Sequence, residues 1–137
     1  MAENVTKKFL YVNRKAPYGT IYALESLEVV LIGAAFEQDV SVAFIDDGVY
    51  QLKKDQSTDG IGMKNFSPTY NALGDYEVTQ IYVDKDSLDE RGLTADDLMN
   101  LVYEDEDDDY AEKPSISIVN RDELAQLMEQ QDVVLSF

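Results

Sequence analysis

The sequence predicts an α/β fold: one domain with a mostly parallel five-stranded sheet and helices on both faces. Five short apolar runs rich in β-branched and aromatic residues lie along the chain, and helical patterns separate them. The length of 137 residues suits a single domain spanning 1–137. Because strands alternate with helices, we expect parallel strands joined by right-handed crossovers in a three-layer sandwich.

The first strand and the first helix are expected in the N-terminal third. The strand covers residues 9–12, and the loop 13–19 follows because it contains a proline and a glycine. The helix covers 21–36, where apolar residues recur at intervals of three and four.

The second half of this helix, from Val29 to Phe36, is apolar on nearly all sides. A small domain does not cover such a helix completely, so we expect another subunit to bury part of it. A competing interpretation pairs residues 28–36 with 40–45 as a hairpin. The length and helical period of the segment favour the helix.

The rest of the chain continues the alternation. Apolar runs of strand length predict strands at 40–45, 77–83, 115–119 and 133–137. Capping residues, closing glycines and apolar spacing predict helices at 64–73, at 84–92, from 95 onward, and at 122–130. Six consecutive acidic residues at 104–109 predict a solvated, mobile loop at about 103–113.

Charge and composition exclude several classes of function. The chain has 11 basic and 28 acidic residues, a net charge of −17, and neither histidine nor cysteine. Ser-His-Asp and thiolate nucleophiles, disulfides and ordinary zinc sites are therefore excluded. Nucleic acids and anionic membranes are poor partners because their binding depends on cationic side chains. Without a signal-peptide core or an apolar run of bilayer length, we expect a cytoplasmic protein with no cofactor or metal.

In a parallel sheet, ligand or partner chemistry lies beyond the carboxyl ends of the strands. Here that rim is expected to consist of 13–19, 46–48 and 84–87. Its carboxylates, Asp46, Asp47 and Asp84, are the candidates for acid–base chemistry.

Simpler interpretations compete at this rim. Asp46 and Asp47 are also typical of a turn. Arg14 and Lys15, beside a helix start, can hold a small anion or can be two solvated basic residues. The first loop has only Gly19 where a dinucleotide-binding loop carries three glycines.

The nine tyrosines are more numerous than a core of this size requires. Tyrosine is favoured at contact surfaces, so together with the apolar helix it predicts an extensive interface. The candidate interface residues are Tyr18, Val29, Ile32, Phe36, Tyr50 and Tyr82.

Several segments together resemble the DsrF/TusC family. They are Lys7-Lys8-Phe9 with Ala16–Thr20, the D-G-V-x-Q-L motif within Phe44–Leu52, the R-G-L motif within Ser87–Leu93, and the ending Val133–Phe137. The resemblance runs from near the N-terminus to the last residue, and the two motifs together are specific. The segments 13–15 and 64–68 are more similar to the DsrF branch of sulfur-oxidising bacteria than to the TusC branch of the tRNA-thiolation relay.

The resemblance implies a DsrE-like fold and a cytoplasmic heterohexamer with two copies each of DsrE-, DsrF- and DsrH-type subunits. Such complexes pass sulfane sulfur as a cysteine persulfide and exchange it with a DsrC-type protein. In the active sister subunits the sulfur-bearing cysteine lies just after the third strand, which falls at about Asp84 here.

A carboxylate cannot carry a persulfide, so the resemblance implies a non-catalytic subunit that supports assembly and docking. Two alternatives stay open. One is a subunit of a TusBCD-like relay for tRNA 2-thiolation, and the other is an enzyme that uses the rim carboxylates.

Overall fold

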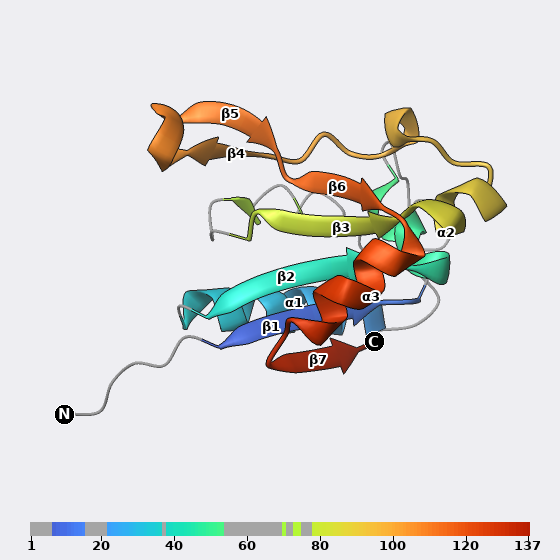
Figure 1. The fold of residues 1–137 in the computed structure, drawn as a ribbon, viewed down its shortest axis with the longest axis horizontal. Helices are drawn as coiled ribbons and strands as arrows, with labels where there is room; N and C mark the ends of the chain where they lie inside the picture. Colours follow the sequence, from blue (N-terminus) through green and yellow to red (C-terminus); the bar gives the residue numbers. More distant parts are fainter. Residues whose placement is uncertain (1–6, 16–21, 37, 54–69, 71–72, 75–77) are drawn as a thin grey trace, which may run out of the picture.

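The computed structural model describes residues 7–15, 22–36, 38–53, 70, 73–74 and 78–137. Figure 1 shows strands and helices alternating along most of the chain. The elements are β1 (Lys8–Asn13), α1 (Tyr22–Ala35), β2 (Asp39–Phe44), the 3-10 helix η1 (Asp46–Leu52), β3 (Gln80–Asp84), α2 (Lys85–Glu90), the 3-10 helix η4 (Ala95–Asp97), β4 (Val102–Asp105), the 3-10 helix η5 (Glu106–Asp108), β5 (Ala111–Pro114), β6 (Ile116–Val119), α3 (Arg121–Glu129) and β7 (Val133–Ser136).

The main sheet has five strands in the order β6-β3-β2-β1-β7, and every pairing in it is parallel. The predicted fold class is therefore confirmed. Asn13 pairs with Phe44, and Phe44 pairs with Val83. Because of this register, the central strands β1, β2 and β3 end at the same edge of the sheet, as the sequence predicts.

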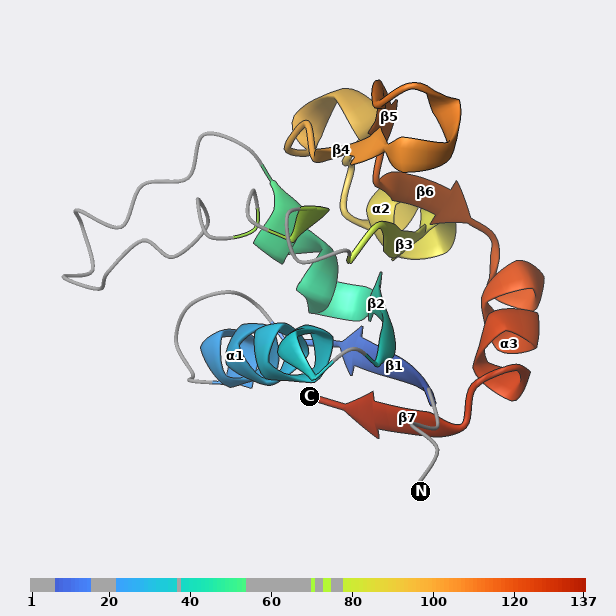
Figure 2. The same cartoon turned by 90° about the vertical axis from the view of Figure 1, so that its left-hand side faces the viewer.

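The sheet separates two apolar cores. Figure 2 shows α1 on one face of the sheet and α3 on the other. The larger core includes Leu27 and Val30 of α1 packed against strand residues such as Phe44. The smaller core on the α3 face contains Leu10, Val12, Ala43, Val119 and Leu124. Leu124 is the buried residue of α3, so α3 covers its face much more thinly than α1 covers the other.

The first helix forms as predicted, and the alternative hairpin is wrong. The helical period places Leu27 and Val30 toward the sheet, where both are buried. Ile32 is 57% exposed and Phe36 is 73% exposed, so the described residues leave this end of the apolar segment uncovered. In the described part of the chain, no helix is long and apolar enough to cross a membrane.

The acidic segment is more regular than the predicted loop. Residues 102–114 form an antiparallel hairpin of β4 and β5 connected by η5. Lys113 Nζ lies 2.5 Å from Asp105 Oδ2 and 3.3 Å from Asp108 Oδ2. This cross-strand lysine offsets part of the acidic charge of the hairpin. Residues 106–110 at the tip are exposed, which agrees with the expected solvation.

Most described elements match the sequence prediction to within two residues at each end, and two differ by more. β3 begins at Gln80 instead of residue 77. The helix expected from residue 95 is limited to the three residues of η4. It stops because the chain turns and the Met99 N–H donates to the Leu52 carbonyl at 2.7 Å.

The turn expected at Asp46 and Asp47 extends further than predicted, because the chain forms the seven-residue 3-10 helix η1 there. The first turn of η1 packs closely against the end of β1 and requires Gly48. A Cβ at this position would lie 1.9 Å from the carbonyl oxygen of Asn13. Only glycine fits this close approach of two backbone segments. The helix predicted at 64–73 falls mostly outside the described residues.

Candidate functional site

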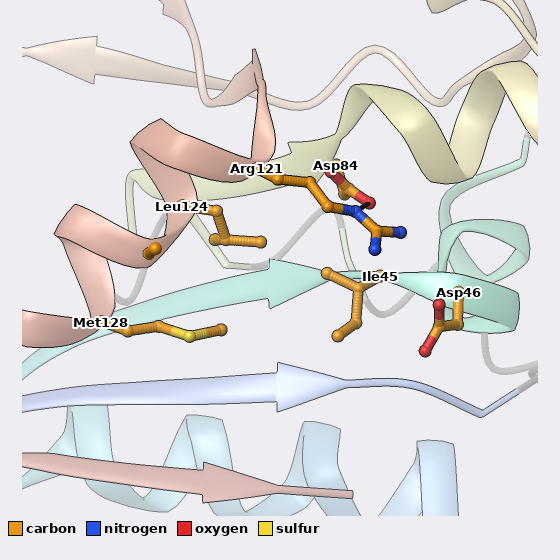
Figure 3. Close-up of a pocket in the computed structure, with 7 residues that line it drawn as sticks. Ile45, Asp46, Asp84, Arg121, Leu124 and Met128 are labelled. Atoms are coloured by element: carbon orange, nitrogen blue, oxygen red, sulfur yellow. Dashed lines mark hydrogen bonds and ion pairs between the residues drawn. The ribbon is translucent and has the colours of Figure 1, made fainter.

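A pocket of about 190 Å³ lies at the edge where the central strands end. Figure 3 shows Arg121 reaching from the start of α3 toward Asp84, with Leu124 and Met128 of the same helix and Ile45 beside it. The complete lining consists of Ile45, Asp46, Asp84, Arg121, Leu124, Ala125 and Met128.

Asp84 is the most constrained polar residue of the pocket. It is the last residue of β3, is 1% exposed and caps the N-terminus of α2. Its Oδ2 accepts hydrogen bonds from Ser87 Oγ at 2.6 Å, from Ser87 N at 3.3 Å and from Arg121 Nε at 3.2 Å. Its Oδ1 is buried and has no hydrogen-bond partner among the described residues. These contacts fix the carboxylate in one orientation.

Ser87 connects the ends of two strands. It is fully buried, and its hydroxyl donates to Asp84 while accepting a hydrogen bond from the Asp46 N–H at 2.9 Å. Asp46 adopts a left-handed backbone conformation with φ of 50°. The serine therefore joins the end of β3 to the sharp turn that follows β2.

The charges around the pocket nearly balance. Arg121 lies 3.7 Å from Asp86 as well as close to Asp84, and Arg14 lies 3.6 Å from Asp46. The negative charge of Asp84 is the largest cause that raises the pKa of Arg121 above its ordinary value. The Arg121 side chain is 56% exposed, so solvent screens much of this attraction.

The structure brings two of the three candidate rim carboxylates together. Asp46 and Asp84 line the pocket, whereas Asp47 lies outside it and pairs with Arg91 at 3.1 Å. Arg91 also donates to the Ser87 carbonyl at 3.1 Å. The two motifs quoted for the family resemblance are thus in contact, because Asp47 belongs to one and Arg91 to the other.

The remaining candidate residues are scattered. Arg14 and Lys15 are exposed, and Arg14 pairs with Asp46. Among the interface candidates, Ile32 and Phe36 are exposed, whereas Val29, Tyr50 and Tyr82 are half-buried. Burial raises the pKa of Tyr82, with a smaller effect of the same sign from Asp39. Tyr18 lies outside the described residues.

Sequence reasoning placed Ser87 in the expected rim segment 84–87 without naming it as a candidate, and it missed Arg121. Asp84 and Ser87 are three residues apart, and this Asp-x-x-Ser spacing before a helix was a capping signal in the sequence. Arg121 could be found only from strand order. It follows β6, and β6 pairs with β3 so that Val119 lies beside Asp84.

The pocket orients a carboxylate but offers little acid–base machinery. Asp84 accepts three hydrogen bonds on one oxygen, and its other oxygen is buried. Within the described ranges, no group of three or more acidic side chains is arranged to hold a metal ion.

The fold and the pocket together define a single-domain α/β protein with a polar site at the carboxyl edge of a parallel sheet. The sequence profile of the DsrE/DsrF-like family matches residues 7–137. The chain therefore belongs to the DsrE/DsrF-like family, and the predicted resemblance is confirmed.

Three known proteins illustrate the likeness. The chain is 60% identical over 133 residues to the "Intracellular sulfur oxidation protein DsrF" of Allochromatium vinosum, which covers 97% of this chain and 98% of that protein. It is 37% identical over 89 residues to a "Protein TusC homolog" of Vibrio parahaemolyticus, covering 65% of this chain and 75% of that one. The crystal structure of the ychN protein from E. coli superposes with a TM-score of 0.70 at 21% identity, covering 97% of this chain and all of that one. This last likeness shows the fold alone.

Proposed function

We propose that this chain is a non-catalytic subunit of a cytoplasmic sulfur-transfer complex that serves intracellular sulfur oxidation. In this role it supports assembly with DsrE- and DsrH-type subunits, two copies of each in a heterohexamer. It also helps to form the surface on which a DsrC-type sulfur acceptor docks. The sulfur itself is carried by cysteines of the partner subunits.

The proposal rests on one observation: this chain is very similar to DsrF, and its pocket holds a carboxylate where a sulfur-carrying subunit has a cysteine. The 60% identity extends over 97% of the chain. At the end of β3, where the family resemblance places the sulfur-bearing cysteine of active subunits, this chain has the buried and clamped Asp84. Sulfur transfer requires a thiolate, and the sequence contains no cysteine.

Exposed apolar surface supports an assembly role. Ile32 lies on α1, Phe36 directly follows the helix four residues later, and both are largely exposed. Large exposed apolar side chains close together are typical of surfaces that a partner covers. We propose that the surface formed by Ile32 and Phe36 at the end of α1, with Val29 beside it, contacts another subunit of the complex.

The second candidate is a subunit of a TusBCD-like relay for tRNA 2-thiolation. The TusC relatives favour it, but their identity and coverage are lower than those of DsrF. A carboxylate enzyme at the rim is disfavoured, because Asp84 is held by three hydrogen bonds and Asp47 lies outside the pocket.

Sulfur loading of the reconstituted complex tests the non-catalytic role. The chain is purified together with DsrE- and DsrH-type partners, treated with polysulfide, and analysed subunit by subunit by mass spectrometry. We expect added sulfur on the partners' cysteines and none on this chain. Asp46→Asn should leave transfer to a DsrC-type acceptor unchanged, because the variant keeps the backbone hydrogen bond to Ser87 and weakens only the exposed ion pair between the Asp46 carboxylate and Arg14. A large loss of turnover in that variant would support the carboxylate enzyme instead.

A further inference from the structure

The strand β7 forms one open edge of the main sheet. It pairs with β1, and no described strand lies on its other side. Figure 1 shows β7 at the margin of the sheet beyond β1. An edge strand of this kind presents unpaired backbone N–H and C=O groups, which another strand can bind.

The register identifies which backbone groups face outward. The Phe137 N–H donates to the Val12 carbonyl at 2.8 Å, and the Arg14 N–H donates to the Phe137 carbonyl at 2.9 Å. In a parallel pair, every second residue of a strand directs its backbone groups toward the same neighbour. Leu135 therefore faces β1 together with Phe137, whereas Val134 and Ser136 present their N–H and C=O groups to the open edge.

The side chains of β7 lack the usual protection of an open edge. Natural edge strands carry lysine, proline or a bulge that prevents pairing with other chains. The sequence Val133-Val134-Leu135-Ser136 contains no charge and no proline, and its pairing with β1 is continuous. Val134 is 43% exposed and Leu135 is 40% exposed. Because adjacent residues point to opposite faces, both faces of this edge are apolar and accessible.

From these observations we propose that β7 is a docking site for an extended segment of a partner protein, which adds to the sheet as a further strand. Its backbone hydrogen-bonds with Val134 and Ser136, and its apolar side chains pack beside Val134 on one face and Leu135 on the other. This role goes beyond the proposed sulfur relay, because it depends only on the edge of the sheet.

Charge determines the kind of segment that fits. The chain has a net charge of −17, and Asp132 directly precedes β7. Pairing β7 with β7 of a second copy would bring two such negative chains together, which long-range repulsion opposes. The favoured occupant is therefore an uncharged apolar strand flanked by basic residues, and it comes from a different protein.

A peptide titration on the full chain tests this site. The probe is an acetylated and amidated heptapeptide in which alternating valine and threonine are flanked by lysine. The chain carries isotope-labelled valine and leucine methyl groups, which remain visible by NMR in large assemblies. We expect saturable shifts at Val134 and Leu135, and none at Val78, which is fully buried. A probe N-methylated on alternate residues cannot donate to the edge and should bind at least tenfold more weakly.

A matched pair of variants tests the backbone contact itself. Val134→Pro removes an N–H that faces outward, so it should leave the fold intact, as for prolines at natural sheet edges. It should weaken probe binding at least tenfold. Val134→Thr keeps the N–H and the branched shape and should bind within about threefold of the wild type. If Val134→Pro fails to fold, the N-methylated probe on the wild-type chain decides the question.

Four results of the peptide titrations would overturn the proposal. They are the absence of saturable shifts at Val134 and Leu135, equal binding of the N-methylated probe, equal binding by folded Val134→Pro, and equal binding of a probe flanked by glutamate. Shifts at Val134 that grow with protein concentration alone, together with a doubled native mass, would assign the edge to a second copy and also refute it. Co-assembly with DsrE- and DsrH-type subunits is measured separately, so either proposal can fail alone.

Discussion

Replacing Ser87 by alanine should destabilise the chain by about 3 kcal/mol. The variant loses the 2.6 Å hydrogen bond from Ser87 Oγ to the Asp84 carboxylate, and a bond to a charged group contributes roughly 1.5–3 kcal/mol. It also removes the acceptor of the part-buried Asp46 N–H at 2.9 Å, which adds about 1 kcal/mol. Because the serine is fully buried, water does not readily replace either bond.

The assay is equilibrium unfolding of the full chain in urea, followed by the fluorescence of its nine tyrosines in a sequence without tryptophan. With a slope of about 1.5–2 kcal/mol per molar urea, the midpoint should fall by roughly 1.5–2 M. Ser26→Ala is the matched control. Ser26 is also buried, but its hydroxyl has no partner among the described residues, so its removal should be neutral or stabilising. A loss below about 1 kcal/mol for Ser87→Ala, or equal losses for both variants, would refute the role of Ser87 as the bridge.

Three further predictions concern the turns, the proposed interface and the acidic hairpin. Gly48→Ala should destabilise by more than about 2 kcal/mol, because its Cβ would collide with the Asn13 carbonyl. Gly92→Ala should destabilise by only about 1 kcal/mol, because φ is 67° there but the added Cβ would meet no neighbouring atom within 4 Å. A larger loss of stability for Gly92→Ala than for Gly48→Ala in urea unfolding would contradict this. Phe36→Asp should change stability by less than about 0.5 kcal/mol, because Phe36 is 73% exposed, yet it should reduce co-purification with partner subunits; unchanged co-purification would exclude this surface. The hydrogen bond from Lys113 lowers the pKa of Asp105 in the folded state. The pair therefore stabilises the fold above the unfolded carboxyl pKa of about 3.9, and this stabilisation is lost as the pH falls through the lower folded pKa. An NMR titration should therefore give Asp105 a pKa below about 3.9, and a normal or higher value would refute the cross-strand pair.

Most of the fold could be predicted because local pattern and tertiary packing agree. In α1 the apolar period matches the face that packs on the sheet, and Leu27 and Val30 are buried on that face. The five strands of the main sheet are apolar runs, because helices cover both faces of the sheet. The positions of the strands can therefore be predicted from the sequence alone.

The predictions failed where a long-range contact decides the local structure. In the hairpin of β4 and β5, the strands pair over four residues and Lys113 reaches Asp105, whereas the acidic composition of the segment is typical of a loop. η4 ends because Met99 donates to Leu52, which comes from a distant part of the chain. Local propensity contains no information about either contact.

The same reason explains what was missed in the site. The rim position of Asp46 and Asp84 followed from the order of strands and helices. Arg121 approaches Asp84 only because β6 lies next to β3, and strand order cannot be read from hydrophobic periodicity. Ser87, in contrast, could have been identified from its spacing to Asp84 as a helix cap.

The central claim is that this chain functions as a subunit of a larger complex, and its native mass tests that claim most directly. Light scattering after size exclusion is performed on the chain alone and again after co-expression with DsrE- and DsrH-type partners. We predict a stable heterohexamer that forms only when all three kinds of subunit are present. A well-behaved monomer whose mass does not change with these partners would contradict the claim and return attention to Asp46 and Asp84 at the rim.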